Sequence, residues 1–277
     1  MPCGQTMCNF CMCHSYLLTS QQVVIVVFSI ETIGLVVPCY NEAQRLNFDS
    51  FSRILHLAPV HLIFVNDSST DTTHELLTNF QKKNQSRVSL IGMEVNSGKG
   101  EAVRNGINFA FTQGLTNVAY TDADLAVPPH EIVNFLTTSQ GLPNLSVFLG
   151  SRVKLLGTRI SRSPFRHIYG RIFALITYLV TGESIYDTQC GLKMLRKCPE
   201  VEMALSVPFR TRWLFDIELL RRLNIEIAQS KGTWLRENAV EIPLREWTDV
   251  PGSHLRIRDG IVAFLYIPYI RRKTRYQ

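Results

Sequence analysis

The segment YTDADLAVPP, residues 120–129, places two carboxylates one residue apart at the end of an apolar run. Like charges at this spacing repel each other, so Asp122 and Asp124 need a positive partner or hydrogen-bond donors. A metal ion, a base or sugar hydroxyl, or solvent alone would each satisfy them. Mg²⁺ and Mn²⁺ take one or two carboxylates together with substrate phosphates. The pair therefore suits metal-assisted chemistry on a phosphorylated ligand, and it offers no cysteine or histidine for a softer metal.

Short β-branched runs alternate with segments of helical spacing from residue 33 onward. We expect strands at 33–37, 60–67, 88–94 and 117–124, and helices at 41–55 (capped by Asn41), 69–83, 98–114 and 128–139. This alternation predicts an α/β fold with a mostly parallel sheet flanked by helices. In such sheets, ligands bind beyond the carboxyl ends of the strands.

Residues suited to binding follow three of these strands: Pro38, Tyr40, Glu42, Asp67 and the Asp122–Asp124 pair. Taken singly, each aspartate is explained equally well as a cap of the following helix. Taken together they favour a binding site, because Asp122 lies too early to cap the helix that opens with two prolines.

The motif NSGKG, residues 96–100, lacks both the glycine spacing and the hydroxyl residue of a phosphate-binding P-loop. It predicts a tight turn at a helix start that either holds a phosphate or only shapes the loop. Lys99 is then either a ligand or a solvated lysine.

The middle of the chain is basic and then apolar. No aspartate or glutamate occurs between Glu131 and Glu183, where the basic residues are Arg152, Lys154, Arg159, Arg162, Arg166 and Arg171. The apolar run 172–180 that follows is shorter than the roughly 20 residues of a bilayer span. It is either buried in the core or lies in the membrane interface, with arginines reaching headgroup phosphates. Residues 259–277 again combine the two features, here as an apolar segment followed by a basic tail, and two such segments favour a protein that works against a bilayer.

The 277 residues carry a formal net charge of +6, which favours anionic partners. Nucleic acid is disfavoured, because the basic residues alternate with aliphatic ones and not with stacking aromatics. The seven cysteines are interpreted as reduced, which favours a cytosolic face. We expect an uncertain or disordered extension at 1–31, one domain at 32–255, and a membrane-proximal helix with a basic tail at 256–277.

The order of the motifs PCYNE, VND, NSGKG, DAD, GSR, DTQCG and RWLFDIELL resembles the inverting family 2 glycosyltransferases that load a sugar onto a polyprenyl phosphate. RSPFR, DTQCGLK and RWLFDIELL are most similar to the dolichyl-phosphate β-glucosyltransferase branch. The resemblance covers about residues 32 to 265 and implies a GT-A (Rossmann-like) fold. It also implies UDP-glucose as donor, a polyprenyl or dolichyl phosphate acceptor, and a membrane-associated enzyme whose site faces the cytoplasm. The membrane would be the endoplasmic reticulum in a eukaryote and the plasma membrane in a bacterium.

The resemblance also implies roles for individual residues. Pro38, Tyr40, Glu42 and Asp67 would hold the base and ribose, Lys99, Asp122 and Ala123 would continue the nucleotide-sugar site, and Asp124 would reach a Mg²⁺ or Mn²⁺ ion. Arg152, Arg166 and Arg162 would grip phosphates, and Asp187 with Gln189 would orient the sugar or acceptor. Asp216 and Glu218 either act near the sugar or pair with arginine.

Two departures from the family pattern bear on these roles. Ala126 stands where the mannosyl branch has a glutamine, which argues against GDP-mannose. His254 stands where the family has a lysine, so a neutral imidazole would attract phosphate less. The alternatives are transfer of mannose or another hexose to the same acceptor, and a non-catalytic membrane-associated protein that binds a nucleotide sugar.

Overall fold

The computed structural model describes residues 16–19, 22–25, 32–161, 164–212 and 214–250. The chain divides into two units, Met1–Glu31 and Thr32–Gln277. In the first unit, β1 (Tyr16–Thr19) and β2 (Gln22–Ile25) form an antiparallel pair. Within the described part of the chain, no helix has both the length and the apolar character needed to cross a membrane.

The second unit is built around a seven-stranded sheet with the order β10-β7-β9-β6-β3-β4-β5. Its strands are β3 (Ile33–Cys39), β4 (Val60–Asn66), β5 (Val88–Gly92), β6 (Asn117–Tyr120), β7 (Val147–Ser151), β9 (Lys193–Arg196) and β10 (Ala239–Pro243). Only β9 runs antiparallel to its neighbours, β6 and β7. The predicted α/β fold with a mostly parallel sheet is confirmed. A separate parallel pair joins β8 (Arg159–Ser161) to β11 (Glu246–Thr248).

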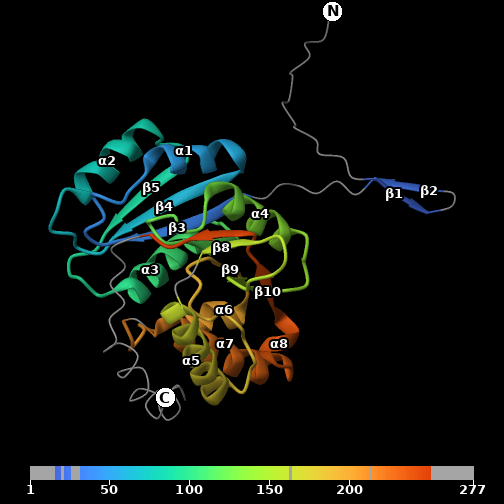
Figure 1. Cartoon of the computed structure of the whole chain (residues 1–277). Helices are drawn as coiled ribbons and strands as arrows, with labels where there is room; N and C mark the ends of the chain where they lie inside the picture. Colours follow the sequence, from blue (N-terminus) through green and yellow to red (C-terminus); the bar gives the residue numbers. More distant parts are fainter. Residues whose placement is uncertain (1–15, 20–21, 26–31, 162–163, 213, 251–277) are drawn as a thin grey trace, which may run out of the picture. The chain divides into compact units, whose positions relative to one another are not determined.

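Helices cover both faces of this sheet (Figure 1). The helices are α1 (Phe48–Leu57), α2 (Thr73–Lys83), α3 (Lys99–Thr112), α4 (Pro129–Gln140), α5 (Pro164–Thr181), α6 (Pro199–Ala204), α7 (Phe215–Lys231) and α8 (Leu235–Asn238). Side chains of β3 alternate between the two layers, since Leu35 packs with α1, α2 and α4 whereas Val36 packs with α3, α6 and α7. Both faces are therefore buried, as a sheet of continuous apolar strands requires.

The register brings the strand ends to one edge. Cys39 at the end of β3 lies beside Asn66 at the end of β4, and Val36 lies beside Tyr120 at the end of β6. The strand predicted at 117–124 ends at Tyr120, so the carboxylate pair lies beyond the sheet and not within it.

The helix predicted at 41–55 begins later. Its first residue is Phe48, and the cap is Asn47, whose Oδ1 accepts a hydrogen bond from Ser50 N at 3.0 Å. Asn41 instead has a left-handed backbone (φ 53°) and accepts from Thr70 N at 2.8 Å. Both asparagines suit a cap, and the apolar spacing that starts at Phe48 decides between them.

Helix α3 carries Lys99 to the edge of the sheet, and Gly106 sets how closely this helix approaches β3. A Cβ atom at position 106 would lie 3.0 Å from Val65 Cγ2 and closer still to Val36 Cγ1. Both valines are fully buried, so neither can move away easily.

Gly106→Ala should therefore destabilise the protein. Overpacking of a core costs about 1–3 kcal/mol, and the better helix propensity of alanine offsets at most about 1 kcal/mol. Urea unfolding followed by circular dichroism measures the difference. Gly92→Ala is the control, because a Cβ at position 92 meets nothing within 4 Å. Equal stability of the two variants would contradict this packing argument.

Candidate active site

A pocket of about 380 Å³ opens at the carboxyl edge of the sheet. Its wall is formed by residues that follow β3, β4, β6 and β7 and by the first turns of α3 and α7. It contains most of the residues proposed from the sequence: Pro38, Tyr40, Glu42, Asp67, Lys99, Asp122, Ala123, Asp124, Arg152, Gln189 and Asp216. The fold thus gathers motifs from both halves of the chain into one cavity.

Two of the proposed residues do not line this pocket. Asp187 and Glu218 are buried elsewhere, at 2% relative exposure each. Arg162, His254 and the side chain of Arg166 lie outside the described residues.

Asp122 is held by a cation and by close packing. Lys99 Nζ forms an ion pair with Asp122 Oδ1. Burial favours a raised pKa for Asp122, but the Lys99 ammonium, followed by Lys193 and Arg152, holds that pKa below its ordinary value. A Cβ at Gly191 would lie 2.9 Å from Asp122 Oδ1 and closer to Oδ2, so the glycine of the DTQCG loop makes room for this carboxylate.

Asp124 is less well compensated. Its Oδ1 accepts a hydrogen bond from Ala126 N at 3.2 Å, and its Oδ2 lies 3.8 Å from Arg45 Nη1. Burial and then the charge of Asp122 raise the pKa of Asp124. A cation at this position would favour the ionised form, which the surrounding protein disfavours.

Asp67 shapes the neighbouring turn. Its two oxygens accept from Ser97 N at 2.7 Å and Gly98 N at 2.8 Å. Gly98 has φ 95°, a conformation that glycine adopts without strain. The NSGKG turn is therefore tied to the end of β4 by a carboxylate that also borders the pocket.

Glu42 borders the pocket from the segment that follows β3. Its Oε1 accepts from Arg45 Nη2 at 2.5 Å, while Oε2 is buried without a hydrogen-bond partner among the described residues. Burial raises the pKa of Glu42, and Arg45 partly offsets this shift. Tyr40 beside it is 43% exposed, which leaves its ring available to a ligand.

Arg152 is fixed by Asp187. The Arg152 guanidinium donates to the Asp187 carboxylate through Nε at 2.7 Å and Nη2 at 2.8 Å, and Arg152 N donates to the same group at 3.0 Å. The guanidinium also lies 5.2 Å from the centre of the Trp247 ring. Such a two-pronged ion pair orients Arg152 firmly, so Asp187 acts on the pocket through this arginine.

Asp216 lies at the base of the pocket in a buried polar cluster. Its Oδ1 accepts from Lys193 Nζ at 2.6 Å and from Tyr120 Oη at 2.7 Å. Burial, and after it the Asp216 charge, raises the pKa of Tyr120 well above its ordinary value. Lys193 is 1% exposed, and this pairing compensates its charge.

Glu218, two positions after Asp216 in the same motif, binds the loop that precedes α7. It accepts from Arg222 Nη2 at 2.6 Å and from Arg210 N at 3.1 Å. This geometry matches the structural pairing with arginine that the sequence analysis left open.

Several pocket residues were not assigned an individual role from the sequence: Cys39, Arg45, Asn96, Gly98, Ala102, Arg212, Phe215, Trp247, Asp249 and Val250. Arg45 and Asn96 lie within or next to the motifs already noted, and that nearness was a usable signal. Lys193 lies two residues after the DTQCG motif and places a charge in a strand, which is a second signal, in this case of a buried ion pair.

Residues 35–199 match the family described as glycosyl transferase family 2. The dolichyl-phosphate beta-glucosyltransferase of Drosophila melanogaster is 30% identical over 243 residues, covering 80% of this chain and 69% of that protein. The protein of the same name from Mus musculus is 30% identical over 245 residues, covering 82% and 74%. A solved structure of glucosyl-3-phosphoglycerate synthase from Mycobacterium tuberculosis, with Mn²⁺, UDP and glucosyl-3-phosphoglycerate, is 18% identical with a TM-score of 0.57, covering 86% of this chain and 80% of that chain. The structural likeness concerns the fold.

The packing of Asp122 on Gly191 generates a prediction. Gly191→Ala should destabilise the protein by about 1–3 kcal/mol, because the added methyl group displaces the carboxylate from Lys99. In an Asp122→Ala background the same change should have little effect, since the clash is gone. Urea unfolding of the four proteins in this double-mutant cycle measures the coupling. Additive effects would show that the two residues do not interact.

Proposed function

The chain belongs to glycosyl transferase family 2, and from this membership we propose that it moves glucose from UDP-glucose to dolichyl or another polyprenyl phosphate with inversion at the sugar. The observation that carries the proposal is the Asp122–Asp124 pair beside Arg152 in one pocket, in a chain related to dolichyl-phosphate beta-glucosyltransferases. The pair suits the diphosphate of a donor, and the arginine suits the phosphate of an acceptor.

The donor would lie along the ends of β3, β4 and β6. Tyr40, Glu42 and Asp67 are assigned to the base and ribose, with Pro38 forming the wall behind them. Asp122 and Ala123 continue this site towards the sugar. Lys99 forms an ion pair with Asp122 and also borders the cavity. Its ammonium group would therefore lie near the negative charge of the donor.

A divalent cation fits the residues present. Asp124 has a pKa raised by burial and by Asp122, so a positive charge beside it would be favourable. The described residues hold no group of three or more metal-binding side chains, and this agrees with a site that takes few protein ligands and relies on the donor's phosphates. Asp124 would hold Mg²⁺ or Mn²⁺, which supplies neutralisation of the diphosphate charge as it leaves.

The acceptor phosphate is anionic at pH 7, because its second pKa is about 6. It needs positioning and charge stabilisation more than a general base. Arg152, oriented by Asp187, and Arg166, with Arg162 near it in sequence, are assigned to this phosphate. One phosphate oxygen forms a bond to the anomeric carbon while the bond from that carbon to the UDP oxygen breaks, so an α-linked sugar becomes β-linked.

The sugar itself would meet Gln189 and Asp216. The Gln189 Nε2 atom is buried and has no hydrogen-bond partner among the described residues, so it is available to a sugar hydroxyl. Asp216 offers a carboxylate at the base of the same cavity. His254 is retained as a candidate contact to phosphate.

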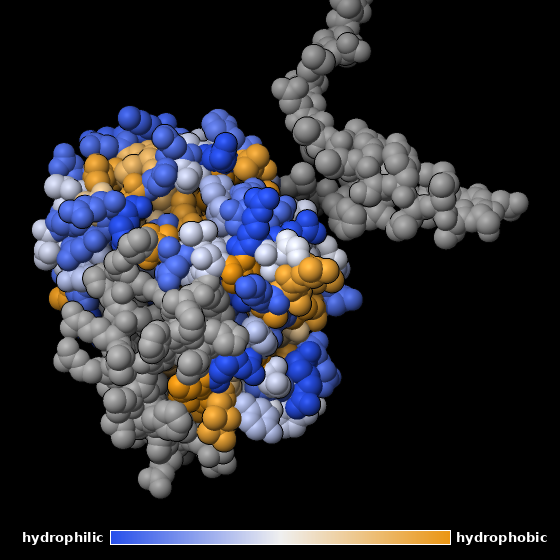
Figure 2. Space-filling view, viewed as in Figure 1, coloured by the Kyte–Doolittle hydropathy of each residue, from blue (hydrophilic) through white to orange (hydrophobic). Residues whose placement is uncertain are grey.

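A lipid acceptor requires a surface that meets a membrane, and α5 offers one. Leu175, Tyr178 and Leu179 lie on one face of α5 and are 52%, 53% and 40% exposed. The opposite face packs Phe173 and Ile176 into a buried cluster. Figure 2 shows apolar side chains at the position of α5. We assign this face to the bilayer interface, with the pocket open to the cytoplasmic side.

Transfer can be tested with radiolabelled UDP-glucose, dolichyl phosphate, the purified full chain and Mn²⁺. Label should enter the lipid phase and should be released by mild acid as glucose. GDP-mannose and other nucleotide sugars, offered in parallel, separate glucose transfer from that of another hexose. Binding of UDP-glucose without turnover of any donor would instead indicate a non-catalytic nucleotide-sugar-binding protein.

Asp124→Asn should lower transfer by about 100-fold or more, since loss of one charged catalytic contact has effects of this order. Its fold should persist. The raised pKa of Asp124 means that protonation stabilises the folded state, and this stabilisation is lost as pH rises through the folded pKa. The variant should thus unfold at no lower urea concentration than the parent at pH 7 in metal-free buffer. Asp49→Asn, an exposed change on α1, is the control; unchanged transfer by Asp124→Asn would remove the metal assignment.

The membrane assignment gives a separate expectation. Replacing Leu175, Tyr178 and Leu179 together by serine should weaken binding to sedimented vesicles of phosphatidylcholine and phosphatidylserine by at least about tenfold, given the apolar area that is lost. A matched variant with serine at Leu57 and Met203, which are also exposed, should bind as the parent does. Equal binding of both variants would exclude α5 as the contact.

A further inference from the structure

An arginine from the loop before α7 lies across one wall of the pocket. Arg212 is exposed and borders the cavity. Its Nη2 donates to the main-chain oxygen of Asn96 at 2.6 Å and also to Asn96 Oδ1. Its side chain covers Gly98 so closely that a Cβ there would lie 2.9 Å from Arg212 Nε. Residues more than a hundred positions apart in the chain therefore meet at the donor side of the pocket.

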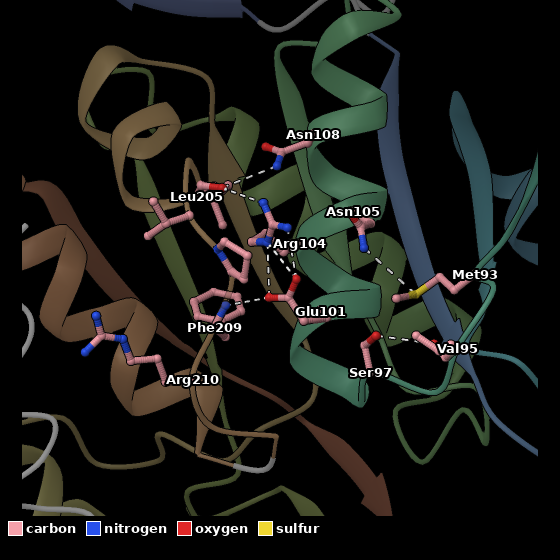
Figure 3. A network of polar contacts seen from close by, with 12 residues as sticks. Met93, Val95, Ser97, Glu101, Arg104, Asn105, Asn108, Leu205, Phe209 and Arg210 are labelled. Carbon is pink, nitrogen blue, oxygen red and sulfur yellow. Dashed lines mark hydrogen bonds and ion pairs between the residues drawn. The ribbon is translucent and has the colours of Figure 1, made fainter.

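The loop that carries Arg212 is held by two carboxylates. From α3, Glu101 Oε1 accepts from Phe209 N at 2.5 Å (Figure 3). From α7, Glu218 Oε2 accepts from Arg210 N at 3.1 Å and from Thr211 N at 3.2 Å. These side chains are 13% and 2% exposed, so both carboxylates are largely or fully removed from water.

Each carboxylate is paired with an arginine that grips the same loop. Arg104 lies 2.9 Å from Glu101 and donates to Leu205 O at 3.2 Å (Figure 3). Arg222 lies 2.6 Å from Glu218 and donates to the main-chain oxygens of residues 204, 207 and 208. Buried ion pairs fix both the N–H and the C=O groups of the loop, which pre-organises its end at Arg212.

The charge of Arg212 is not neutralised by a neighbouring acid in the described part of the chain. The other cations that border the pocket each meet a carboxylate: Arg45 meets Glu42, Lys99 meets Asp122 and Arg152 meets Asp187. Arg212 instead meets only the neutral oxygens of Asn96 through Nη2. An uncompensated guanidinium with further N–H groups attracts an anion or an oxygen-rich ligand.

We propose that Arg212 is a donor-binding residue that contacts acceptor oxygens of the nucleoside diphosphate, and that Glu101 and Glu218 position it. The proposal rests on the proposed function, since it requires a nucleoside diphosphate in this pocket. The oxygens belong either to the diphosphate or to the carbonyl groups of the base, and both are acceptors for the same fork of N–H groups.

Calorimetric titration of the full chain with UDP in the presence of Mn²⁺ tests this role. Arg212→Ala should weaken UDP binding about tenfold, as for loss of one charged hydrogen-bonding contact. Arg212→Lys keeps the positive charge but loses the planar guanidinium with its several N–H donors. Its UDP affinity should lie between those of the parent and Arg212→Ala. Arg210→Ala is the matched control, because Arg210 belongs to the same loop and its side chain points away from Glu101 (Figure 3).

Parallel titrations with UMP and uridine locate the contact. A loss seen with UDP and UMP but not with uridine assigns the diphosphate end, and a loss seen with all three assigns the base. Unchanged UDP affinity of Arg212→Ala, or an equal loss in Arg210→Ala, would overturn the proposal while leaving the donor site intact. Failure of the parent chain to bind UDP would instead remove the proposed function and this inference together.

The positioning role of Glu101 can be tested separately. Glu101→Gln weakens the hydrogen bond from Phe209 N and should reduce UDP affinity several-fold at a temperature where the variant remains folded. Combined with Arg212→Ala it should cause no further loss, because both changes act through the same side chain. Additive losses would show that Glu101 acts on the fold in general and not through Arg212.

Discussion

The repulsion between Asp122 and Asp124 is the constraint on which the pocket depends. Lys99 forms an ion pair with Asp122, and it reaches this position because Gly106 lets α3 pack tightly on β3. The surrounding protein leaves Asp124 with a raised pKa. A further positive charge would be favourable beside Asp124, and a divalent cation bound together with a diphosphate would supply that charge.

A second principle governs the cations. A pocket that takes an anionic ligand needs positive charge, but unpaired arginines and lysines would repel one another and remain mobile. The ion pair with Asp187 offsets part of the positive charge of Arg152, but it also fixes the direction of the Arg152 N–H groups. Arg212 gains its direction differently, from the loop that Glu101 and Glu218 hold, and it therefore keeps its charge.

The sequence alone predicted the alternation of strands and helices and the mostly parallel sheet. It also identified binding residues after β3, β4 and β6. These features could be predicted because hydrophobic periodicity and strand ends are local signals. The cap predicted at Asn41 was wrong, because the apolar helical spacing begins only at Phe48 and Asn47 caps that helix. Contacts across the chain also escaped prediction: nothing near Arg212 in the sequence indicates Asn96 as its partner. Such contacts depend on how α3 and α7 pack on the same face of the sheet.

The start of α7 shows how much one helical turn can organise. Successive residues of a helix point about 100° apart, and three consecutive positions here meet three different surroundings. Asp216 faces the pocket, Ile217 packs against α5 beside Ile176, and Glu218 holds the loop that carries Arg212. The helix assigned to the membrane interface and the loop assigned to the donor therefore rest on the same turn. A shift of α7 would alter both the lipid side and the nucleotide side of the pocket, so the rigid packing of this turn keeps acceptor and donor in register.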